Sequence, residues 1–118
     1  MSIAVLVLML AVGVAISGAG LAAYAAASNA ADAAALAAAP VTFRPFGATG
    51  SPAREAAVFA ARNGATLVSC VCRVDRSWAK RTVTVRVTRT LAVPGVGSFE
   101  ISATSKATFD PALLIPEP

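Results

Sequence analysis

The sequence predicts an α+β fold, in which a long N-terminal transmembrane helix continues into a small head of one short helix and a three-stranded antiparallel sheet. Three observations predict it. The first thirty residues carry no charge, strong helix formers continue from there to Pro40, and apolar and polar residues alternate along 81–93 and 98–109. Alternation with a period of two is typical of strands that bury one face. We therefore expect two parts, a helix over residues 1–39 and a head over residues 40–118.

Charge is distributed unevenly along the chain. Ten Lys or Arg and six Asp or Glu give a net charge of +4, and 14% of the residues are charged, against about 25% in a typical soluble domain. Asp32 is the only charged residue before Arg44, and histidine is absent from the sequence. The commonest general base and transition-metal ligand is therefore missing. We expect no catalytic residue, no cofactor and no metal site, and hence no enzyme.

Residues 3–27 are all apolar or small. About 20 such residues suffice for a helix to cross a bilayer core of about 30 Å. A cleaved signal peptide is the main alternative, with an Ala-x-Ala site ending at Ala39, but its apolar region is usually about 7–15 residues long and follows Lys or Arg. A buried core helix is the third alternative. Orientation cannot be read here, because no Lys or Arg lies close to either end of the segment.

The helical pattern extends beyond the length that a membrane requires. Alanine-rich sequence reaches Ala39, and Pro40 is expected to end the helix because the residue before a proline avoids the α conformation. A helix over 3–39 would be about 55 Å long, so its second half must lie in water or against the head. Small residues four apart allow close packing between helices. The candidates for such packing are Gly13, Ser17, Gly18 and Ala22.

The head opens with a Pro- and Gly-rich loop over 40–50 and a short helix. Ser51 is a good N-cap, Pro52 suits the first helical position, and Asn63-Gly64 supplies the stop. The apolar face of this helix is expected to comprise Ala56, Phe59 and Ala60, with Ala57 as a further candidate.

Three strands are expected after the short helix. In the first, "TLVSCVCRV", the residues on one face are Val68, Cys70, Cys72 and Val74. In the second they are Val83, Val85, Val87 and Leu91, and in the third they are Phe99, Ile101, Ala103, Ala107 and Phe109. A turn at 94–97 joins the second and third strands, and the tail from residue 110 is expected to be extended. The dry face of the sheet needs a cover, which the short helix and the second half of the long helix can provide.

Two groups of head residues are candidates for chemistry or binding. Cys70 and Cys72 are two small buried residues, a disulfide, or a redox or metal pair; two strand residues at this spacing lie near the upper limit of Cα separation for a disulfide. Residues 73–89 hold six positive side chains and one acid, Asp75. They form either a solvated strand face and loop or a patch for an anionic partner. Nucleic acid is not expected, since only Trp78 offers a stacking surface. The candidate partner contacts are Arg73, Arg76, Trp78, Lys80 and Arg81.

The layout resembles the TadE-like minor pilins or pseudopilins of actinobacterial tight-adherence (Tad/Flp) pilus clusters. The resemblance covers roughly residues 1–109, and its most specific part is "AxxxAxxNGAxLxxC", from Ala56 to Cys70. It implies a single-pass protein of the cytoplasmic membrane with the head outside. The implied partners are membrane lipid, other pilin-like subunits and the pilus assembly platform, and the implied role is structural, in a pilus or a related secretion apparatus.

The sequence departs from that family at two points. Pilins are usually made with a short, positively charged leader, whereas Met1 here starts the apolar segment directly. They often have a Glu near the new N-terminus, whereas the residue at position five here is a valine, Val5. A prepilin peptidase is a partner only if a leader lies upstream. Relatives also often pair the Cys after "NGA" with one in or before the preceding helix, where this chain has none. Two alternatives stay open: a secreted domain released near Ala39 that binds an anionic partner through 73–89, and a membrane-anchored surface protein without a pilus role.

Overall fold

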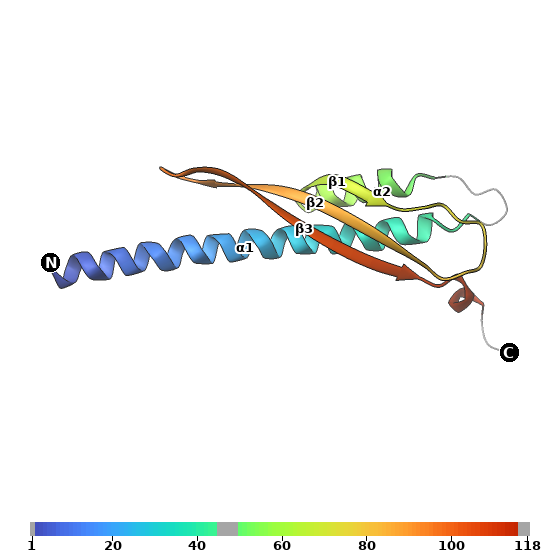
Figure 1. Cartoon of the computed structure of the whole chain (residues 1–118), viewed down its shortest axis with the longest axis horizontal. Coiled ribbons are helices and arrows are strands. Elements are labelled where there is room, and N and C mark those ends of the chain that lie inside the picture. The colour runs from blue at the N-terminus through green and yellow to red at the C-terminus, as the bar shows by residue number, and fades with distance from the viewer. Residues whose placement is uncertain (1, 45–49, 116–118) are drawn as a thin grey trace.

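The computed structural model describes residues 2–44 and 50–115, except for the side chains of Ile16, Ser17 and Ala19. The elements, in order, are α1 (Ile3–Val41), α2 (Pro52–Arg62), β1 (Thr66–Val71), β2 (Arg81–Val93), β3 (Gly97–Phe109) and the 3₁₀ helix η2 (Pro111–Leu114). The molecule measures 73 × 30 × 17 Å, and α1 runs along most of its length (Figure 1). The predicted α+β class, with a long helix, a short helix and a three-stranded antiparallel sheet, is confirmed.

Helix α1 ends two residues later than predicted. Its 39 residues correspond to about 58 Å, and Pro40 lies inside the last turn rather than after it. A proline there removes one helical hydrogen bond close to the end, where the disruption is small. Thr42 supplies two bonds at the same point, because its backbone N–H and its hydroxyl both donate to the carbonyl oxygen of Ala39, at 3.2 and 2.6 Å.

The core of the head is a layer of alanines from α1 against valines from the central strand. The buried α1 residues recur at helical spacing on one face; they are Ala23, Ala27, Ala30, Ala31, Ala34, Ala35, Ala38 and Ala39. Facing them, Val83, Val85 and Val87 of β2 are at most 1% exposed. Because alanine ends at Cβ, the helix can pack closely against the sheet, and the second half of α1 covers the sheet as predicted.

Helix α2 begins and ends where the sequence indicates. The Ser51 hydroxyl accepts a hydrogen bond from the Arg54 N–H at 3.2 Å, and Gly64 takes the positive φ of 75° that follows many helix ends. Ala56 and Ala60 are buried together with Pro52, and Phe59 is half-buried. Ala57 is exposed, so it does not belong to the apolar face.

The sheet is an antiparallel meander in the order β1-β2-β3. Strands β2 and β3 pair in register over thirteen residues each, from Arg81↔Phe109 to Val93↔Gly97. Pro94 and Gly95 form the turn between them: the Val96 N–H donates to the Val93 carbonyl at 3.0 Å, and Gly95 has a φ of 80°, as the third residue of a type II turn requires. The predicted turn at 94–97 is confirmed.

The inward face of β1 differs from the prediction. The register shifts between Leu67 and Ser69, which is a β-bulge. The extra residue shifts the alternation within β1, so Leu67 and Cys70 both face the core and Val68 is 53% exposed. Val74 is 37% exposed in the segment that follows the end of β1 at Val71. Placing Val68 and Val74 on the face of the cysteines was therefore wrong.

Two further expectations need correction at the ends of the β2–β3 hairpin. Phe99 lies in the predicted inward phase of β3 but is 50% exposed, because this end of the hairpin diverges from α1, which covers the rest of the sheet (Figure 1). The tail after β3 was expected to be extended, but Pro111–Leu114 form a turn of 3₁₀ helix. The Asp110 carboxylate accepts from the Ala112 N–H at 3.1 Å and caps that turn.

Candidate membrane anchor and head surface

The first half of α1 is apolar, and the residues that the structure describes leave it exposed. An 18-residue window of this helix has a mean hydropathy of 2.5, and none of that window is buried. Ile3 is 81% exposed, Val14 is 73% and Leu21 is 72%. This helix is long and apolar enough to cross a membrane, and its first half does not have the burial expected of a core helix in a soluble domain.

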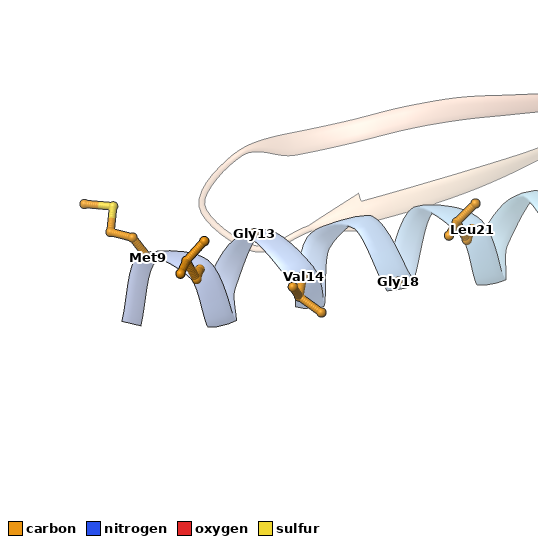
Figure 2. A pocket seen from close by; sticks show the side chains of 6 residues that line it. Met9, Gly13, Val14, Gly18 and Leu21 are labelled. Atoms are coloured by element: carbon orange, nitrogen blue, oxygen red, sulfur yellow. The ribbon is translucent and has the colours of Figure 1, made fainter. Parts of the chain in front are cut away.

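The predicted helix-packing residues fall on this uncovered half. Gly13 and Gly18 line a shallow groove together with Met9, Leu10, Val14 and Leu21. Figure 2 shows the side chains of Met9, Val14 and Leu21 projecting from the helix, with bare backbone at the two glycines. A Cβ added at Gly18 would meet nothing within 4 Å. Ala22 is exposed one turn further along, and the side chain of Ser17 lies outside the described residues.

The second half of α1 is part of the head. From Ala27 to Ala39 the buried face of the helix is at most 3% exposed, and its alanines belong to the same cluster as Val85 of β2 and Ala60 of α2. A cut after Ala39 would remove this half of the core and expose the valines of the central strand. The apolar segment and the head are thus joined through one continuous helix.

Cys70 and Cys72 form a disulfide, with their Cα atoms 5.3 Å apart. Strand β1 ends at Val71, so the two cysteines do not both hold the extended geometry that separates alternate strand residues. Both side chains are half-buried and pack against the core cluster. Of the three alternatives that the sequence left open, the structure shows the disulfide. It ties the end of β1 to the segment that leads to β2.

Arg81, one of the candidate partner contacts, makes its hydrogen bonds within the head. Its guanidinium donates to the carbonyl oxygens of Thr42 (3.3 Å), Asp75 (2.6 Å), Ser77 and Ala79. Its Cζ also lies 5.6 Å from the centre of the Phe43 ring. A single half-buried cation therefore holds the loop before β2 against the end of α1.

The other candidate contacts lie on the surface of the same loop. Trp78 is 47% exposed, and its ring meets that of Phe43 edge to face at 4.9 Å between centroids. Arg73, Arg76 and Lys80 are exposed. One part of the predicted basic patch is thus available at the surface, while Arg81 has a structural role.

Asp75 is the acid of this basic loop, and its pKa is lowered from the ordinary value. The main cause is hydrogen bonding from the Ser77 N–H, at 2.8 Å, and from the Ser77 side chain. The positive charges of Arg81 and Arg73 lower the pKa further. The Asp75 N–H in turn donates to the Thr42 carbonyl at 2.8 Å, next to a parallel bridge between Phe43 and Asp75. The loop is therefore fixed to the end of α1 at several points.

Two features of the structure were missed from the sequence. The Ser105 hydroxyl donates to the Asp32 carboxylate, which fixes β3 along α1; an isolated acid in an otherwise uncharged helix was a signal that Asp32 has a partner in the head. The β2–β3 hairpin also reaches back along α1 toward its N-terminus (Figure 1). The thirteen-residue length of the alternating segments could have indicated this, because strands of that length are longer than the rest of the head.

Comparison with known proteins adds no relative: no family model, no curated protein and no solved structure matches this chain.

Proposed function

We propose that this chain is a membrane-anchored minor pilin or pseudopilin of the TadE-like kind, a structural component of a Tad-type pilus or a related secretion apparatus. The first half of α1 spans the cytoplasmic membrane and packs against the helices of other subunits. The second half carries the head outside the cell. The role is mechanical and needs no catalysis.

The observation that carries this proposal is that the two halves of α1 have different surroundings. One continuous helix presents an uncovered apolar half, and it uses its other half as the core of an α+β head. A simple anchor joined by a linker would not need to share its helix with the head. Because the anchor and the core of the head belong to one continuous helix, packing of the apolar halves in a membrane or filament would fix how the heads are arranged relative to one another.

The two other readings fit these observations less well. Release at Ala39 would separate the head from its own alanine layer, so a secreted fragment over 40–118 would expose the buried valines of β2. For an anchored protein without a pilus role, the groove at Gly18 would have no assigned packing partner, whereas the pilin reading supplies one in the helices of other subunits. The resemblance over residues 56–70 supports the pilin reading further.

Substitution in the groove tests the assembly role. Gly18→Leu fills the groove, while Ala15→Leu makes a larger side chain at an exposed position that does not line it. We expect Gly18→Leu to abolish recovery of the protein with sheared filaments or the purified assembly complex, while its level in the membrane stays normal. Ala15→Leu should be recovered as the wild type is. Normal assembly of Gly18→Leu would contradict close packing at this groove.

A further inference from the structure

The tip of the β2–β3 hairpin is apolar and has no charged residue. Residues 91–99 read "LAVPGVGSF". Val96 is 63% and Phe99 is 50% exposed, and Pro94 is exposed at the turn between them. The nearest charges are Arg89 and Glu100, where the strands leave the tip. The exposed apolar side chains of this uncharged tip would be more stable in an apolar environment than in water.

The hydrogen bond between Ser105 and Asp32 marks the height of the tip along α1. Gly97 lies eight residues from Ser105 in β3, which is about 26 Å of strand at ~3.3 Å per residue. The same length of helix is about 17 residues, which brings the tip to about the level of Ala15. The strands cross the helix at an angle in Figure 1, which shortens this reach only slightly, and Figure 2 shows the turn of the hairpin at about the level of Gly13 and Val14.

This height overlaps with the apolar half of the helix. A membrane core of about 30 Å takes up about 20 helical residues, so a span that begins at Ile3 ends near Ala22. The tip then reaches at most about 10 Å below the level of Ala22, which is the depth to which interfacial elements insert into the boundary between headgroups and acyl chains. The anchor and the hairpin point in the same direction from the head (Figure 1).

We propose that the tip over residues 91–99 is a second membrane contact, inserted into the interface of the outer leaflet beside the helix. This rests on the membrane anchoring of the proposed function, and it assigns that leaflet as a partner of the head. Two contacts, the helix and the hairpin, hold the head at a fixed tilt and rotation, where a helix alone would let it turn about its axis.

The pairing of the strands limits how deep the tip goes. Strand β1 pairs with β2 only as far as Thr88, and β3 is an edge strand of the sheet. Beyond Thr88 the hairpin therefore has two outer edges that pair with no other strand among residues 2–44 and 50–115. Open edges are not tolerated in hydrocarbon, where each unpaired backbone group costs several kcal/mol. The interface supplies water and headgroups to these edges, while Val96 and Phe99 contact the upper acyl chains.

Tryptophan quenching in vesicles tests the insertion. The chain has one tryptophan, Trp78, which lies at the opposite end of the sheet next to Phe43. Full-length protein is reconstituted, at low protein-to-lipid ratio, into phosphatidylcholine–phosphatidylglycerol vesicles with bromine at a shallow or a deep acyl position. Three proteins are compared: the wild type, Val96→Trp with Trp78→Phe, and Leu8→Trp with Trp78→Phe.

We expect the tryptophan at position 96 to lose most of its fluorescence with shallow bromine and less with deep bromine, and Trp78 to lose almost none. The tryptophan at position 8 reports the anchor itself and should be quenched by deep bromine. Quenching at position 8 without quenching at position 96 would overturn the hairpin proposal and leave the anchor standing. Absence of quenching at both positions would overturn both. Loss of quenching at position 96 as protein concentration rises, with crosslinking between copies, would show that the tip prefers a second copy, and would also overturn the proposal.

Discussion

The Ser105 hydroxyl of β3 donates a hydrogen bond to the carboxylate of Asp32 on α1. This contact links residues 73 positions apart and, together with the alanine and valine core, holds β3 at one level along the helix. It also explains why a charged residue occurs in an alanine-rich helix that otherwise carries none. The pair marks the level of β3 along α1, from which the position of the hairpin tip relative to the apolar half of α1 can be derived.

Removing either partner should destabilise the head modestly. Asp32→Ala and Ser105→Ala should each lower the free energy of unfolding by about 1 kcal/mol, the net value of a typical hydrogen bond. Denaturant unfolding of the full-length protein in detergent micelles measures this. The double variant should cost less than the sum of the two single changes, and Ser102→Ala, an exposed residue of the same strand, should cost little. Strict additivity would show that the two side chains do not interact in solution.

The alanine layer should not accept larger side chains. Ala35 lies on the face of α1 that packs against the rest of the head and is fully buried, whereas Ala25 is exposed on the same helix. Ala35→Leu should destabilise the protein by about 1–3 kcal/mol through overpacking, and Ala25→Leu should stay within about 0.5 kcal/mol of the wild type. Thermal unfolding followed by circular dichroism compares the two variants. Equal stability would mean that α1 does not pack closely against the sheet.

Arg81 should matter more to the head than its charged neighbours do. Arg81→Ala removes the donors to four backbone carbonyl oxygens, and we expect a loss of about 2 kcal/mol together with a red shift of Trp78 emission as the loop opens. Arg81→Lys keeps the charge but not the planar set of donors, so it should restore only part of the stability. Lys80→Ala is the matched control at an exposed site. A variant at Arg81 that behaves like Lys80→Ala would argue for a surface role instead.

Reduction of the disulfide should weaken the head without unfolding it. The bridge between Cys70 and Cys72 closes a loop of only three residues, and loop closure then contributes about 1.5 kcal/mol, roughly half the value for a 15-residue loop. Denaturant unfolding with and without dithiothreitol measures the difference. A double Cys→Ala variant controls for effects of the reductant elsewhere. Unfolding of the head on reduction alone would show that the bridge does more than constrain this short segment.

The elements of the fold could be predicted because each has a local cause. Ser51 and Gly64 begin and end α2, Pro94-Gly95 defines the hairpin turn, and the alternation at Val83, Val85 and Val87 gives the buried face of β2. The uncharged N-terminal segment likewise predicts a helix long enough for a membrane. These signals lie within a few residues of the structure that they specify.

What could not be predicted depends on contacts between distant residues. The bulge at Val68 is set by the register of β1 on β2, which shifts the inward face of the strand. Arg81 reads as one of several basic residues in the sequence. Its four acceptors depend on the path of the loop over 75–79 around it and on the approach of Thr42 at the end of α1. The exposure of Phe99 follows from the divergence of the hairpin end from α1, which no pattern within β3 reveals.

The most direct test of the central claim is the intact mass of the protein recovered from its native host. The chain is expressed with its natural upstream DNA, and washed membranes, sheared filaments and culture medium are analysed separately. We predict that the head is recovered from membranes and filaments still joined to residues 3–39, with any cut lying before the apolar segment. A soluble fragment that begins at Pro40, found in the medium, would contradict both the anchor and the shared helix on which the proposed function rests.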